Sequence, residues 1–138
     1  MIQIELTIIF TVTNIYDEKV RIFIIKNLTY FYGLTELNCE QCFFREIPEL
    51  PERLIFLNCN NNNLKKLPDL PNSLTYLMCY HNKLEELPNL PNSLIGLECR
   101  HNKLKELPDL PNSLIGLGCY YNNLTYPNLE IKTINETN

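Results

Sequence analysis

The sequence predicts a solenoid, in which one short structural unit is repeated along the chain and successive copies stack. Five cysteines, Cys39, Cys59, Cys79, Cys99 and Cys119, lie 20 residues apart. Leucines return at constant offsets around each cysteine, and a Leu-Pro-x-Leu-Pro segment recurs in the three central units. A fixed period of this length is typical of repeat architectures, because one unit cannot bury its own leucines whereas stacked neighbours can.

The first 33 residues lie outside the repeat, and we expect them to form an N-terminal cap. Apolar and polar residues alternate over residues 2–12, and residues 20–25 are a second run rich in β-branched side chains. Both patterns indicate strands, so a β-hairpin that covers the exposed edge of the first repeat is the simplest interpretation. A short helix in place of one strand is the alternative.

Residues 34–129 divide into five repeats, and each is expected to begin with a strand of roughly five residues. Leucine at position 4 and cysteine at position 6 alternate with variable residues, which is the period of a strand. Two prolines in the second half of each unit exclude a helix there, so an extended, polyproline-like convex side is expected. The repeats span 34–53, 54–73, 74–93, 94–113 and 114–129, and the tail 130–138 is compatible with a partial strand.

In such a stack, equivalent residues of successive repeats should form internal columns about 4.8 Å apart. The leucines at position 4 form one column and the five cysteines form another. The asparagines at position 9 form a third, and their amides are expected to satisfy turn backbone groups that would otherwise be buried without partners. The members of this third column are Asn62, Asn82, Asn102 and Asn122.

The frame Leu-x-x-Leu-x-Cys-x-x-Asn-x-Leu, complete in residues 74–84, resembles the leucine-rich repeat. The 20-residue length and the Leu-Pro-x-Leu-Pro tail are similar to the short repeats of bacterial effector proteins and of repeat proteins from large DNA viruses. The first copy departs from the frame at Cys42 and Phe44, and the last copy loses a residue after Leu124. The resemblance implies a horseshoe with a parallel sheet on its concave face, used to bind other proteins.

Composition excludes several classes of partner. The net charge of −4 gives no electrostatic footprint for nucleic acid or for an anionic membrane. Five of the six cysteines occupy the inward position of the repeat, so we expect all six to be reduced thiols. The protein is then expected to be intracellular and cytoplasmic, in the host cytoplasm if it is viral or an effector. The apolar run 2–12 contains Glu5 and lacks a basic leader and a cleavage site, which disfavours a signal peptide.

The sequence carries no catalytic constellation, and neither a cofactor nor a metal is predicted. Cys39 and Cys42 form a lone C-x-x-C, and a zinc site would need two further ligands. His81 and His101 are expected on adjacent repeats, but two ligands are too few for a metal ion. The chain is therefore predicted not to be an enzyme.

Function is expected at the variable strand positions 3, 5, 7 and 8, which project onto the concave face. These positions hold residue types that are enriched at binding hot spots. The predicted partner-binding residues are Phe56, Tyr76, Met78, Tyr80, His81, Glu98, Arg100, His101, Tyr120 and Tyr121.

Three glycines on the same face, Gly96, Gly116 and Gly118, suggest a close approach of a ligand. One hypothesis is a pit that these glycines floor, with tyrosines on both sides. The competing interpretation is that the glycines reflect drift in a tolerant repeat and that the tyrosines merely cover the sheet.

The sequence thus predicts a non-enzymatic module that binds a protein partner on its concave face. One alternative is a structural protein that self-associates through its N-terminal edge or open end. Another is a substrate-targeting subunit of a ubiquitin-ligase system, which would need a helical adaptor-binding segment within residues 1–33.

Overall fold

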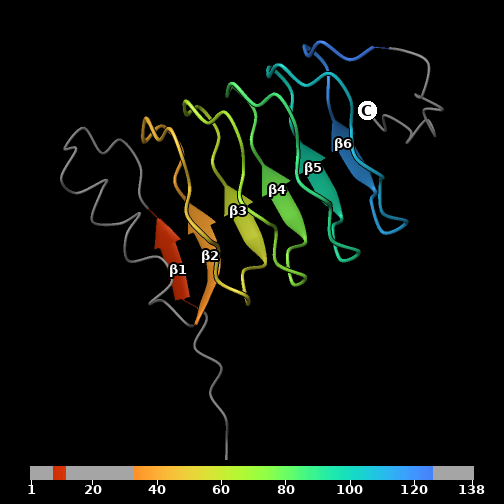
Figure 1. Cartoon of the computed structure of the whole chain (residues 1–138). Helices are drawn as coiled ribbons and strands as arrows, with labels where there is room; N and C mark the ends of the chain where they lie inside the picture. The colour runs from red at the N-terminus through yellow and green to blue at the C-terminus, as the bar shows by residue number, and fades with distance from the viewer. Residues whose placement is uncertain (1–7, 12–32, 126–138) are drawn as a thin grey trace, which may run out of the picture.

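The computed structural model describes residues 8–11 and 33–125, and these residues form one parallel β-sheet (Figure 1). The strands stand side by side in chain order, so each repeat adds one strand next to the last. They are β1 (Ile8–Thr11), β2 (Leu34–Asn38), β3 (Phe56–Asn58), β4 (Tyr76–Met78), β5 (Gly96–Glu98) and β6 (Gly116–Gly118).

The repeats stack in exact 20-residue register, as the sequence predicts. Leu37 pairs with Leu57, Leu57 with Leu77, and the pairing continues to Leu97 and Leu117. Backbone hydrogen bonds extend the ladder beyond each strand, for example from the N–H of Cys79 to the carbonyl of Glu98 at 2.8 Å. Equivalent residues therefore form continuous columns through the solenoid.

The core consists of the predicted columns. The leucines at positions 1, 4 and 11 of the central repeats are fully buried, and so are the cysteines from Cys39 to Cys99. In β4 and β5 the central leucine is buried and the two outer residues are more exposed, which is the alternation of a pleated strand. Cys119 and Leu117 at the last strand are only partly buried.

The return path of each repeat is irregular coil, and the described residues contain no helix. A turn closes each path, in which the carbonyl of the second proline accepts the N–H three residues later, as from Leu74 to Pro71 at 3.0 Å. Serine at position 20 ties neighbouring paths together, since the hydroxyl of Ser93 donates to the carbonyl of Leu74 at 2.6 Å. The two prolines per unit explain why no helix forms.

Strand β1 lies within the run 2–12 that the sequence predicts as a cap strand. It pairs in parallel with β2 and so covers the sheet edge of the first repeat. The second predicted strand, at residues 20–25, lies outside the described residues, as do residues 126–138. The hairpin and the C-terminal partial strand therefore remain predictions.

Candidate protein-binding face

The pleat and a sharp bend in the backbone position the side chains of the candidate site. Positions 3 and 5 point out of the sheet because position 4 is buried. The residue at position 8 has a positive φ in every repeat, for example 51° at His81 and 55° at Tyr121. This left-handed conformation turns the chain away from the strand and is uncommon for residues other than glycine and asparagine. We call the surface made by positions 3, 5, 7 and 8 the concave face.

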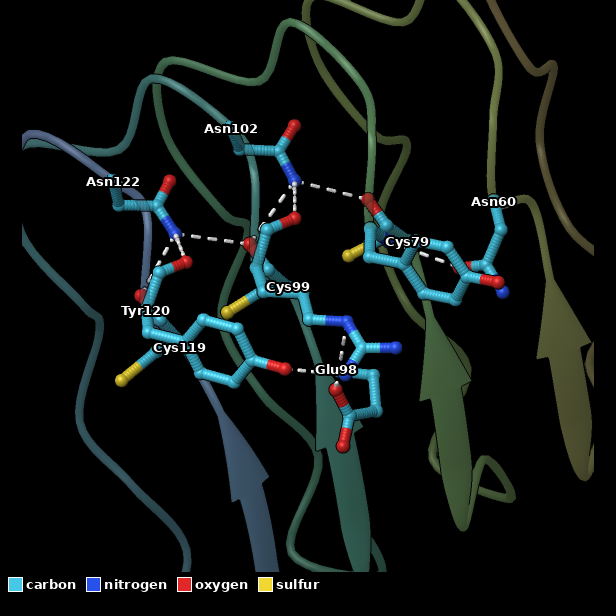
Figure 2. Close-up of polar contacts among 10 residues, drawn as sticks. Asn60, Cys79, Glu98, Cys99, Asn102, Cys119, Tyr120 and Asn122 are labelled. Carbon is cyan, nitrogen blue, oxygen red and sulfur yellow. Dashed lines mark hydrogen bonds and ion pairs between the residues drawn. The ribbon is translucent and has the colours of Figure 1, made fainter.

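The asparagine column fixes this bend from within. The side-chain amide of Asn102 donates to the carbonyls of Cys99 and Cys79 at 3.0 Å each, so it spans two rungs (Figure 2). Its side-chain oxygen accepts the N–H of Leu84 at 3.0 Å. Asn62, Asn82 and Asn122 repeat this arrangement, as Figure 2 shows for Asn122. The predicted role of the column is thereby confirmed, and the bend is held by satisfied buried hydrogen bonds.

The N-terminal half of the concave face is polar. The carboxylate of Glu40 accepts hydrogen bonds from the amides of Asn58 and Asn61, at 3.3 and 2.9 Å. Asn60 is 1% exposed and accepts the N–H of Tyr80 at 2.9 Å. Its amide nitrogen has no hydrogen-bond partner, so this buried donor is unsatisfied. Glu40, Asn58 and Asn61 thus bond to one another on this half of the face.

The C-terminal half is built around Arg100. Its guanidinium carbon lies 4.7 Å from the ring centre of Tyr80 and 5.5 Å from that of Tyr120, one rung to either side. The guanidinium also donates to the Tyr120 hydroxyl and lies 3.9 Å from the Glu98 carboxylate. This hydrogen bond raises the pKa of Arg100 above its ordinary value. Cation–π contacts on two sides hold the charged group in place at a partly exposed site.

A second row of rings runs beside Arg100. The imidazoles of His81 and His101 stack with centres 4.1 Å apart and planes 9° from parallel. The ring of Tyr121 stacks on His101 from the next rung, with centres 4.4 Å apart. Desolvation lowers the pKa of His101 from its ordinary value, and His81 and Arg100 lower it further because neighbouring positive charge disfavours protonation.

Neighbouring side chains fill two of the three predicted glycine spaces. A methyl group on Gly96 would lie 2.7 Å from the ring of Tyr76, and one on Gly118 would overlap the carboxylate of Glu98. Only Gly116 has nothing within 4 Å of such a group. The hypothesis of a pit floored by glycines is therefore wrong at Gly96 and Gly118, where the space belongs to side chains of this chain.

The strand register brings all ten predicted partner-binding residues onto one continuous face. Phe56 pairs with Tyr76, and Met78 pairs with Glu98, so these side chains are direct neighbours across the strands. Tyr121, Tyr120 and Tyr76 are exposed at 69%, 51% and 46%, and His81 is exposed as well. Whether they bind a partner remains a prediction. Asn60 was not among the predicted residues, although it shares position 7 with Tyr80 and Arg100.

The thiols and the potential metal ligands were the other candidates considered from the sequence. Burial raises the pKa of the Cys39, Cys59 and Cys79 thiols well above the ordinary value, and that of Cys99 to about 12. Buried thiols of this kind are inert. Within residues 8–11 and 33–125, no three potential ligands gather as a metal site. No helix in the same part of the chain is long and apolar enough to cross a membrane.

Comparison with solved structures finds close likenesses. The chain is similar to the leucine-rich repeat domain of a Shigella effector, with 38% identity and a TM-score of 0.68 over 70% of this chain and 44% of that one. It is 45% identical to YopM, a leucine-rich effector protein from Yersinia pestis, with a TM-score of 0.64 over 66% of this chain and 26% of that one.

YopM from Yersinia enterocolitica is 38% identical with a TM-score of 0.60, over 67% of this chain and 20% of that one. The chain thus spans less than half the length of each of these proteins. Neither the models of protein families nor the curated proteins give a match. The 20-residue register, the asparagine column and these likenesses together identify the chain as a leucine-rich repeat protein of the short-repeat type found in bacterial effectors.

Proposed function

We propose that the chain is a non-enzymatic module that binds a protein partner through the C-terminal half of its concave face. The observation that carries this proposal is the arrangement around Arg100. A guanidinium held between Tyr80 and Tyr120 offers a partner both apolar ring surface and a positive charge. Tyrosine and arginine dominate the binding energy of many protein interfaces.

The geometry also lowers the entropic cost of binding. Arg100 makes a hydrogen bond, an ion pair and two ring contacts before any partner arrives. The His81, His101 and Tyr121 rings restrain one another by stacking. Immobilising a side chain at an interface costs roughly 0.5–1.5 kcal/mol, so side chains that are already ordered leave more of the contact energy as affinity.

The polar half of the face is a poorer binding surface. The amides of Asn58 and Asn61 already donate hydrogen bonds to the Glu40 carboxylate. A partner that displaced these bonds would have to replace them, which gives little net gain. We therefore place the energetic centre of the interface on β4, β5 and β6.

A capture experiment tests the proposal. Tagged wild-type chain and a Tyr76→Ser, Tyr80→Ser, Tyr120→Ser variant are used to capture proteins from a lysate, and captured proteins are identified by mass spectrometry. The matched control is Glu86→Ser, Asn89→Ser, Asp109→Ser, which changes three exposed residues of the return path. We expect a partner that the wild type and the control retain and the tyrosine variant loses.

Retention of every partner by the tyrosine variant would contradict the proposal. The rival, self-association, would appear instead as an oligomer that grows with protein concentration in light scattering. The ubiquitin-ligase alternative depends on residues 1–33, most of which lie outside the described part of the chain, so it stays a prediction. A reducing, intracellular setting is part of the proposal, and the buried row of free thiols supports it.

A further inference from the structure

A second surface lies where the chain leaves the concave face and begins its return path. Positions 10 and 12 of the repeat alternate with a buried leucine at position 11, so both face away from the core. Five of the eight lysines and arginines within residues 33–125 occupy these two positions. The only acidic residue there is Glu85. We call these five residues the basic strip: Arg45, Lys65, Lys83, Lys103 and Lys105.

The charges of the basic strip are only partly offset, because Glu85 lies between Lys65 and Lys105 along position 12. All five side chains are exposed. None of them makes an ion pair with another described residue, since the one ion pair in that part of the chain joins Arg100 to Glu98. The strip is positively charged although the chain as a whole has a net charge of −4. A local field of this kind attracts a negatively charged partner.

The backbone beneath the strip is fixed. The N–H of Lys83 donates to the carbonyl of Leu64, and that of Lys103 to the carbonyl of Leu84, both at 2.8 Å. These bonds form a second ladder between rungs, beyond the carboxyl ends of the strands. The spacing of the cations along the stack is therefore set by the solenoid.

The strip includes a hollow at its N-terminal end. Arg45, Lys65 and Lys83 line it together with Asn63, and its volume is about 360 Å³. The three cations are hydrogen-bond donors only, and the Asn63 amide offers one donor group and one acceptor. A carboxylate side chain therefore fits the chemistry of the lining.

We infer that the basic strip is a docking surface for an acidic segment of a protein partner, with an Asp or Glu side chain of that segment in the hollow. A polynucleotide fits less well, because acidic residues follow the strip along each return path. Position 13 holds Glu46, Glu86 and Glu106 beside one cation, Lys66, and position 16 holds Glu49, Asp69 and Asp109. These carboxylates would repel a broad polyanion but leave room for one narrow extended segment. The inference does not depend on the concave face.

Fluorescence anisotropy tests this inference with a fluorescein-labelled peptide that contains a run of about six glutamates between Gly-Ser flanks. We expect saturable binding to the wild-type chain that weakens as salt is added. The double variant Lys65→Glu, Lys83→Glu should raise the Kd at least about tenfold, since two charges that attract the peptide become charges that repel it. The control is Lys66→Glu, a single charge reversal of the same kind at an exposed residue of position 13. Because one exposed charge contributes little, we expect it to raise the Kd by less than about twofold.

Circular dichroism and thermal melting establish that each variant folds, and Lys65→Gln with Lys83→Gln replaces the reversal if it does not. Equal binding by the wild type and the double variant overturns the inference, and so does an equal loss with Lys66→Glu. Tighter binding of an oligodeoxythymidine of the same charge also overturns it. The concave variant Tyr76→Ser, Tyr80→Ser, Tyr120→Ser should bind the peptide normally, which separates this surface from the proposed concave site.

Discussion

The asparagine column gives the sharpest quantitative prediction, because its members carry unequal numbers of irreplaceable hydrogen bonds. In Asn102→Ala, the carbonyls of Cys79 and Cys99 keep a second donor, from Asn82 and Asn122 respectively. Only the N–H of Leu84 loses its sole partner. One buried backbone group without a partner costs about 1–3 kcal/mol, so we expect Asn102→Ala to lower the free energy of unfolding by about 2 kcal/mol.

Asn62 differs because the first repeat has Cys42 in place of the ladder asparagine. Among residues 8–11 and 33–125, Asn62 alone bonds to the N–H of Phe44, at 2.9 Å, and to the carbonyl of Cys39, at 2.9 Å. It also accepts the N–H of Cys42 at 3.1 Å. At least two buried groups lose their partners in Asn62→Ala, so the expected loss is about 4 kcal/mol, roughly twice that of Asn102→Ala.

Urea denaturation followed by circular dichroism measures both losses, with equal slopes required for the comparison. The control is Asn92→Ala, at an exposed position of the return path, which should change the free energy of unfolding by less than about 0.5 kcal/mol. If Asn62→Ala proves no more destabilising than Asn102→Ala, the reasoning from irreplaceable hydrogen bonds is refuted.

Three further predictions concern the glycines, the thiols and the histidines. Gly116→Ala should keep or raise the thermal midpoint, because the added methyl group meets open space in a strand. Gly96→Ala should lower the free energy of unfolding by about 1–3 kcal/mol, because its methyl group would be overpacked against Tyr76. Equal thermal midpoints for the two variants would contradict this reasoning. A thiol-specific chromogenic reagent at neutral pH should label Cys119 first, because Cys119 is only partly buried whereas the other five thiols are buried. Rapid labelling of Cys59 in folded protein would argue against the buried row. The pKa of His101 should lie below its ordinary 6.5 in an NMR titration and rise towards it in His81→Ala. Because the folded chain then binds fewer protons than the unfolded chain, stability should fall as pH drops through and below 6.5, and an unchanged His101 pKa in the variant would refute the contribution of His81.

The columns of the core could be predicted from the sequence because they follow from periodicity alone. When identical residues return every 20 positions, any stack in register must place leucine on leucine and cysteine on cysteine. The role of Asn82 or Asn102 follows as well, since a polar residue at a fixed place between buried columns must satisfy buried backbone groups. The strand within residues 2–12 was also predicted, although alternation indicates a strand without naming its partner.

The candidate site was predicted only as a set of positions. That Tyr76 would cover Gly96 and that Glu98 would fold over Gly118 depends on side-chain rotamers, which a variable position does not specify. The placement of Arg100 between two tyrosines depends on how far each side chain reaches across neighbouring rungs. The hollow of the basic strip likewise combines residues from three repeats, so no pattern within one repeat predicts it.

The sequence by itself determined the architecture, because a constant period of leucine, cysteine and asparagine leaves stacking in register as the way to bury those side chains. Only the tertiary structure decided how the variable side chains divide the surface into a polar half, an aromatic half around Arg100 and a basic strip past the rim. The physical reason is that core positions obey one rule in every repeat, whereas each exposed side chain takes its place from neighbours 20 residues away on either side.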